Sequence, residues 1–157
     1  MRPTPVSLLR LLADARARAL PELARAVQAD PADVDAALEA LAAAGATLHR
    51  EPGGAVRLDA PAELLDAERI AVQLRDAGSP VRLAILDECG STNAVLMAQA
   101  AAGQPHASAL ACELQTAGRG RRGTAWVAPV GGALAFSLLW RMRRGGAALG
   151  GLPLAAG

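Results

Sequence analysis

The 157-residue sequence contains no lysine and no tyrosine, so its 16 basic residues are all arginine. Its aromatic residues are one phenylalanine and two tryptophans, and alanine supplies much of the 52% that is apolar. Since alanine buries little area per residue, we expect a core of modest packing. The net charge of +1 argues against a strongly basic nucleic-acid-binding protein.

Cysteine and histidine are equally scarce, which bears on metal and disulfide chemistry. Cys89 and Cys112 form no Cys-x-x-Cys pair, and His49 and His106 stand alone in the sequence. Two cysteines do not make a disulfide framework, and we interpret both as small buried residues. The pattern predicts no metal site.

Long apolar runs are absent as well. The first residues, Met1 to Pro5, lack the apolar h-region of a secretory signal peptide. No stretch of the sequence approaches the length of a membrane span. We therefore expect a cytoplasmic protein without a membrane partner.

The order of the predicted elements divides the chain into two units. Helical spacing of apolar residues, with proline and glycine boundaries, predicts three helices: Val6 to about Arg18, Pro21 to about Val27, and Asp30 to Gly45. Residues 47–50 and 55–58 flank Pro52-Gly53-Gly54 and predict a hairpin. This order is typical of a winged helix-turn-helix domain, which we assign to residues 1–60.

The third predicted helix weighs against DNA binding. It carries Asp33, Asp35 and Glu39 and no basic residue, so phosphates would repel it. Contacts to a DNA backbone could be supplied from the flanks by Arg16, Arg18, Arg25, His49, Arg50 and Arg57. Operator binding is therefore the weaker hypothesis for this unit.

The second unit begins after a predicted linker helix. We assign residues 61–80 to the linker, with a helix from Leu64 to Asp76, and residues 81–157 to the second domain. A predicted strand, Val81 to Leu86, leads into Gly90-Ser91-Thr92-Asn93 and then a helix over 94–102. Ser91 or Thr92 would be its N-cap. The N–H groups of such a helix start can bind a carboxylate or ureido group, although a plain capping motif explains the same residues.

Residues 118–123 read Gly-Arg-Gly-Arg-Arg-Gly, with Gln115 before them and Trp126 after them. Glycines raise the entropy cost of ordering a loop, and adjacent cations repel one another. The entropy cost and the charge repulsion are both offset if the loop closes on an anion while Trp126 stacks on a planar ring. A solvated basic loop between two strands is the alternative. On the first interpretation, Gly118 to Thr124 is disordered until a ligand binds.

Together, these motifs resemble one family. Cys-Gly-Ser-Thr-Asn ends at Asn93, and Glu-Leu-Gln-Thr-Ala-Gly-Arg-Gly-Arg-Arg-Gly-Thr-Ala-Trp begins at Glu113. With Pro129 and the strand-like residues 134–140, the order and spacing closely resemble the biotin–protein ligases, from about Asp66 to the C-terminus. The upstream unit is similar to that of the bifunctional bacterial subgroup. The resemblance implies an α+β fold, a winged helix-turn-helix followed by the start of a class II synthetase-like mixed-sheet domain.

The resemblance also implies a two-step reaction. Biotin's carboxylate attacks the α-phosphate of ATP with Mg²⁺ present, and the biotinyl-5′-AMP then reacts with a lysine of a biotin carboxyl carrier protein. The biotin contacts implied are Ser91, Thr92, Asn93, Gln115, Gly118, Arg119, Gly120 and Arg121. The nucleotide contacts implied are Arg121, Arg122 and Trp126. Arg119 and Arg121 would be the catalytic cations, and no protein-bound metal is expected.

The sequence departs from the family at one end. The family continues through a Lys-Trp-Pro-Asn-Asp-Leu segment, more sheet and a small SH3-like domain, and this lysine-free sequence has no equivalent. We therefore expect a truncated product, inactive alone, whose sheet has an uncovered apolar face. Two alternatives stay open: a biotin-responsive DNA-binding repressor acting as a homodimer, and a non-catalytic remnant.

Overall fold

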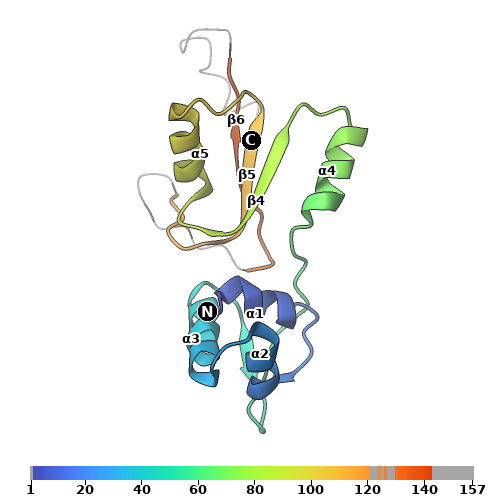
Figure 1. Ribbon diagram of the computed structural model, residues 1–157, viewed down its shortest axis with the longest axis vertical. Helices are drawn as coiled ribbons and strands as arrows, with labels where there is room; N and C mark the ends of the chain where they lie inside the picture. The colour runs from blue at the N-terminus through green and yellow to red at the C-terminus, as the bar shows by residue number, and fades with distance from the viewer. Residues whose placement is uncertain (1, 121–123, 125, 127–129, 143–157) are drawn as a thin grey trace.

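The computed structural model describes residues 2–120, 124, 126 and 130–142, and Figure 1 shows how they are arranged. Within these residues, helices accompany two three-stranded sheets. The expected α+β class is therefore confirmed. One sheet belongs to the N-terminal part of the chain and the other to the part that follows helix α4 (Ala67–Asp76) (Figure 1).

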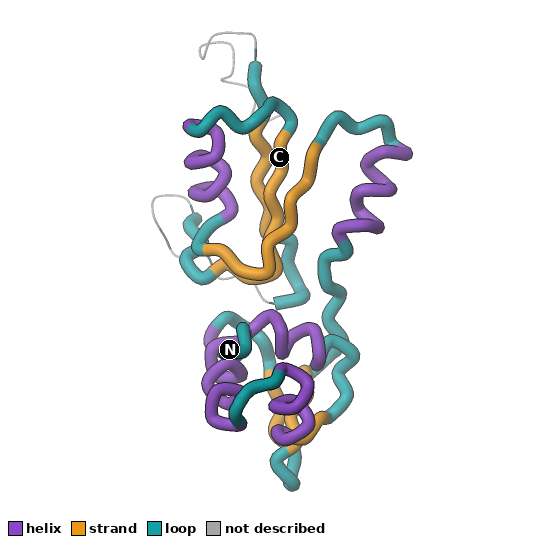
Figure 2. The backbone as a smooth tube through the Cα atoms, viewed as in Figure 1, coloured by secondary structure: helices purple, strands orange, loops and turns teal. Residues whose placement is uncertain are grey.

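The N-terminal part, coloured blue to cyan in Figure 1, alternates helices with short strands. Its elements are α1 (Pro5–Leu12), β1 (Arg18–Ala19), α2 (Leu20–Val27), α3 (Pro31–Ala43), β2 (Leu48–Arg50) and β3 (Ala55–Leu58). The strands pair antiparallel in the order β1-β3-β2, and Figure 2 draws strands in orange and helices in purple. The second and third predicted helices and the hairpin are confirmed.

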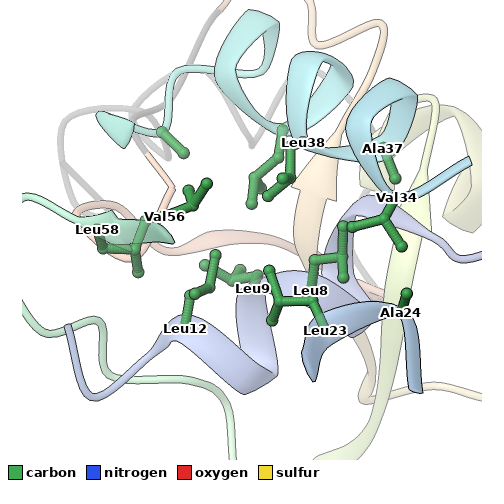
Figure 3. Packing of buried hydrophobic residues seen from close by; sticks show 12 residues of the cluster. Leu8, Leu9, Leu12, Leu23, Ala24, Val34, Ala37, Leu38, Val56 and Leu58 are labelled. Carbon is green, nitrogen blue, oxygen red and sulfur yellow. The ribbon is translucent and has the colours of Figure 1, made fainter. Parts of the chain in front are cut away.

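Leucine supplies most of the core of this part (Figure 3). Leu8, Leu9 and Leu12 of α1 are fully buried, and Figure 3 shows them facing side chains of α3 and β3. The residues they meet there include Val34, Leu38, Val56 and Leu58. Burying one such side chain contributes about 2 kcal/mol to stability.

The first helix ends sooner than the sequence indicates. The prediction placed its end at about Arg18, whereas α1 stops at Leu12. Ala15 has a left-handed backbone (φ 57°), and the Arg18 guanidinium donates to both carboxylate oxygens of Asp14 at 2.6 and 2.9 Å. This guanidinium also holds the pKa of Asp14 well below its usual range. Arg18 is thereby fixed in β1, opposite Val56 of β3.

The second part is built on a mixed sheet covered by one helix. It contains α4 (Ala67–Asp76), β4 (Arg82–Cys89), α5 (Thr92–Ala101), β5 (Ser108–Gln115) and β6 (Ala135–Leu139). The sheet order is β4-β5-β6, with β4 parallel and β6 antiparallel to β5. Helix α5 connects the parallel pair and packs against β5 and β6, while α4 lies beside β4 (Figure 1).

The linker helix begins later than predicted. It starts at Ala67 rather than at Leu64, because Asp66 is its N-cap and accepts a hydrogen bond from the Arg69 amide at 2.9 Å. The residue before the cap, Leu65, donates its amide to Glu113 Oε1 at 2.7 Å. The segment before α4 is therefore held against β5 in an extended conformation instead of continuing the helix.

Strand β6 leaves apolar side chains exposed. Phe136 and Leu138 are 58% and 47% exposed, while Ala135, Ser137 and Leu139 on the opposite face are half-buried. The expected uncovered apolar face of the sheet is confirmed at these positions.

Candidate functional site

The two motif segments meet where the parallel strands end. Cys89, the last residue of β4, lies opposite Gln115, the last residue of β5. Since the carboxyl ends of parallel strands lie at one edge of a sheet, the start of α5 at Thr92 is brought next to Gln115. This edge is where open α/β sheets commonly bind ligands.

Gln115 and Thr92 form the centre of this site. The amide oxygen Oε1 of Gln115 accepts from the Thr92 backbone N–H at 2.8 Å and from Thr92 Oγ1 at 3.2 Å. Thr92 Oγ1 also lies 3.0 Å from Ser137 Oγ of β6. Thr92 is only 3% exposed, so its hydroxyl position is fixed by these contacts.

The predicted N-cap of α5 is confirmed at Ser91. Ser91 is the N-cap residue, but its side chain makes no capping hydrogen bond. A first-turn N–H group of the helix, that of Thr92, is instead satisfied from across the sheet by Gln115. Sequence analysis could not foresee this because Gln115 is distant in the chain.

Ser137 was missed by the sequence analysis. One signal could have found it: within the apolar strand β6, Ser137 is a polar residue on the face that alternation places toward the interior. Asn93, by contrast, is exposed, and its Nδ2 faces Met97 Sδ at 3.7 Å. The structure therefore brings Thr92, Gln115 and Ser137 together and leaves Asn93 outside this group.

The glycine–arginine loop follows Gln115, and two backbone hydrogen bonds join its two sides at the described residues. The Trp126 N–H donates to Gly118 O at 2.9 Å, and the Gly120 N–H donates to Thr124 O at 2.7 Å. The prediction that Gly118 to Thr124 is disordered is therefore wrong at these positions. Arg121 and Arg122 lie outside the described residues, so their predicted roles stay predictions.

Two of the loop glycines lie where a Cβ atom would meet the opposite side of the loop, its backbone at Gly118 and a side chain at Gly120. A Cβ atom on Gly118 would lie 2.5 Å from Trp126 O, and one on Gly120 would lie 2.7 Å from Thr124 Oγ1. Glycine at both positions lets the two sides of the loop pair. Arg119 between them is exposed, and Trp126 is 58% exposed, so both side chains face solvent beside the site.

The loop is also tied to the helix start. The Thr116 N–H donates to Cys89 O at 3.0 Å, and the Ala117 N–H donates to Gly90 O at 2.8 Å. These hydrogen bonds continue the pairing of β4 and β5 past their ends. The end of β4, the start of α5 and the loop therefore form one connected structure.

The described residues hold no group of three or more His, Cys, Asp or Glu side chains that could bind a metal ion. In the same part of the chain, no helix is long and apolar enough to cross a membrane. The chemistry that the described site offers is hydrogen bonding from Thr92, Gln115 and Ser137, the charge of Arg119 and the indole face of Trp126.

The site thus consists of a parallel-strand edge, a fixed hydroxyl–amide pair and an arginine-bearing loop, a set of polar groups of the kind that orients small ligands in proteins. Residues 91–151, which include that pair and the loop, match the Biotin/lipoate A/B protein ligase family. The chain is 36% identical over 154 residues to the bifunctional ligase/repressor BirA of Salmonella typhimurium, covering 98% of this chain and 46% of that protein. It is 34% identical over 153 residues to the protein of the same name from Escherichia coli K12, with the same coverage of 98% and 46%.

The chain belongs to the biotin protein ligase family. It spans about half the length of the curated relatives that it matches.

Proposed function

We propose that this chain carries the biotin-binding part of a biotin–protein ligase. The reaction is ATP-dependent formation of biotinyl-5′-AMP, followed by transfer to a lysine of a biotin carboxyl carrier protein. The observation that carries the proposal is the single amide oxygen of Gln115 shared by the N–H and hydroxyl of Thr92. This contact joins the two motif segments that resemble the family.

The ureido ring of biotin has both N–H donors and a carbonyl acceptor, so its site must offer both kinds of partner. Within the described residues, no hydrogen-bond partner is found for Nε2 of Gln115, which supports its donating to the ureido oxygen. The hydroxyls of Thr92 and Ser137, 3.0 Å apart, supply acceptors for the N–H groups. Ser91 lies beside them and is 7% exposed.

The loop after Gln115 is proposed to bind the two negatively charged groups that react. Biotin's carboxylate and the α-phosphate of ATP repel each other, so cations must offset that repulsion in the transition state. Arg119 is exposed beside the site and can do this, and the same role is proposed for Arg121. The remaining loop contacts proposed for biotin are Gly118 and Gly120.

The nucleotide contacts are proposed at Arg121, Arg122 and Trp126. The exposed indole of Trp126 offers a flat face on which adenine can stack. Since the described residues provide no cluster of metal ligands, Mg²⁺ is proposed to enter with the phosphates of ATP, and no residue of this chain is assigned to it.

The division of the chain is also part of the proposal. Residues 1–60 would form a winged helix-turn-helix, supported by the order of three helices and the β2–β3 hairpin. Residues 61–80 would be the linker. Residues 81–157 would begin a class II synthetase-like domain, supported by the mixed sheet β4-β5-β6.

Repression of an operator by a homodimer is the second candidate, and the winged-helix order favours it. The charges of the same unit weigh against it. Several of its arginines are engaged by carboxylates, as Arg50 is by Asp35 at 3.0 Å and Arg57 is by Glu51 at 2.9 Å. A DNA backbone would have to compete with these pairs and with the acidic face of α3.

Isothermal titration with biotin tests the proposal. Gln115→Ala removes the amide that joins Thr92 to the ligand, so we expect roughly tenfold weaker binding, as for the loss of one hydrogen-bonding group. Gln73→Ala on the exposed face of α4 is the matched control and should bind as the unaltered chain does. Equal biotin affinity in the Gln115 and Gln73 variants would refute the proposed site.

A further inference from the structure

The two cysteines of the chain face each other. Cys89 at the end of β4 and Cys112 within β5 have their Sγ atoms 3.2 Å apart, and both are free thiols. The interpretation of both as small buried residues is confirmed for Cys112 but not for Cys89. Cys112 is 2% exposed, whereas Cys89 is only partly buried, so a small molecule in solvent reaches Cys89 first.

The two sulfur atoms lie close to bonding distance. A disulfide bond is about 2.05 Å long, so the two sulfur atoms must approach by about 1.1 Å from their separation of 3.2 Å. The parallel pairing of β4 and β5 places Cys89 opposite Gln115 and Cys112 opposite Leu86, so the two cysteines are three residues out of register and the end of β4 must move for the bond to form. A structural metal is less well supported, because the described residues offer no third ligand beside the two thiols.

The pair also adjoins the proposed biotin site. Cys89 comes directly before Gly90 and Ser91, and its carbonyl oxygen accepts the Thr116 N–H at 3.0 Å. Cys112 lies on the same strand as Gln115, whose Oε1 holds Thr92. A movement of the end of β4 toward Cys112 must therefore shift the start of α5 relative to Gln115.

We propose that Cys89 and Cys112 form a reversible disulfide that lowers the affinity of the adjoining site for its ligand. The oxidant is a small peroxide. The Cys89 thiolate attacks one peroxide oxygen, which breaks the O–O bond and gives a Cys89 sulfenic acid and hydroxide. The Cys112 sulfur then attacks the Cys89 sulfur, and the S–S bond forms as the S–O bond breaks.

In that second step the proton of Cys112 goes to the leaving hydroxide, so two thiols and one peroxide give one disulfide and two waters. Burial, aided by the hydrogen bond from Cys89, raises the pKa of the Cys112 thiol to about 12. Cys112 is therefore protonated at neutral pH, which is consistent with Cys89 being the sulfur that peroxide oxidises first. A thiol reductant reverses the reaction by exchange.

Mass spectrometry tests the disulfide without reference to any ligand. The chain has two cysteines, so after treatment with hydrogen peroxide and denaturation in N-ethylmaleimide we expect no maleimide adducts on a monomer. Dithiothreitol added after the peroxide and before N-ethylmaleimide should restore two maleimide adducts. Cys89→Ala should keep its remaining thiol alkylatable after the same peroxide treatment. A disulfide-linked dimer, or over-oxidation to sulfinic acid without an S–S bond, would overturn the proposal.

The effect on affinity rests on the proposed function and is measured separately. Biotin titration of the oxidised chain should give roughly tenfold weaker binding than the reduced chain, as for one misaligned hydrogen bond. Peroxide should leave biotin binding of Cys89→Ala unchanged. A disulfide that forms without altering the measured affinity would overturn the regulatory claim. If titration of the reduced chain with biotin releases no heat, the proposed function fails, whereas the mass-spectrometric test of the disulfide is unaffected.

Discussion

Gln115 and Cys112 lie three residues apart on β5, and their environments set different chemistry. The side chain of Gln115 is half-buried and holds Thr92 through Oε1, which leaves its Nε2 to donate to a ligand. Cys112 is enclosed and donates its thiol to Leu114 O at 3.4 Å. Partial burial accordingly makes Gln115 a ligand-binding candidate, and full burial keeps Cys112 in its neutral form.

Alkaline unfolding should report on Cys112. Its pKa is raised from 9.0 to about 12, chiefly by burial, so between these values the folded state holds a proton that the unfolded state has lost. The free energy of unfolding should therefore fall as pH rises from about 9 toward 12. The absence of lysine and tyrosine leaves few other groups that titrate in this range.

Denaturant unfolding at several pH values measures this decline. Cys112→Ala should remove most of it, whereas Asp76→Ala on the exposed end of α4 should retain it. An unchanged slope in the Cys112 variant would mean that the thiol is not shielded from solvent as described.

At the scale of elements, local sequence signals predicted where helices begin but did not predict which residues pair across strands. Proline at the first turn placed α2 and α3 correctly, because its fixed φ suits a helix start. The two-residue β1 carries no such signal and is defined by its pairing with β3, Arg18 with Val56 and Ala19 with Ala55. In the site, the Ser-Thr-Asn turn was predictable, but Ser137 and the Cys89–Cys112 pair depend on strands that meet only in the fold.

The loop closure at Gly118 gives a prediction for hydrogen exchange. The amides of Gly120 and Trp126 donate hydrogen bonds across the loop, so they should exchange more slowly than an unstructured peptide. Gly118→Ala places a methyl group where only 2.5 Å separates it from Trp126 O, and both amides should lose their protection.

Gly53→Ala in the β2–β3 hairpin is the matched control, since a Cβ there meets no atom within 4 Å. It should leave the exchange of Gly120 and Trp126 unchanged. Rapid exchange of both amides in the unaltered chain would restore the disordered loop that the sequence predicts.

At the scale of the whole molecule, the two parts are joined by specific contacts. Arg10 of α1 contacts Asp87 of β4 at 2.5 Å, and the Ala62 N–H donates to Ala13 O at 2.8 Å. The ion pair is exposed, so its own contribution is about 1 kcal/mol or less. Its position two residues before Cys89 nevertheless gives the N-terminal part a direct contact with the strand that leads into the site.

The 157-residue chain by itself is predicted not to transfer biotin to a carrier protein. Its cations are all arginines, and the lysine that the resemblance implies beside the activated carboxylate has no counterpart among them. Losing one preorganised charge typically costs about 3 kcal/mol or more in the transition state. Incubation with ATP, Mg²⁺, biotin and a carrier domain should give no streptavidin signal above a control without enzyme. Turnover comparable to that of a full-length ligase would contradict this.

The most direct test of the account is a titration of the ¹⁵N-labelled chain with biotin, followed by amide chemical shifts. Binding at the end of the parallel strands predicts the largest shifts at the Thr92 backbone amide and the Gln115 side-chain amide, because Nε2 of Gln115 is the proposed donor to biotin and its Oε1 accepts from the Thr92 N–H. Amides of α2 and α3, in the N-terminal part, should move little. Saturable shifts confined to the N-terminal part, or no shifts in a folded sample, would contradict the assignment of Thr92 and Gln115 as the biotin site.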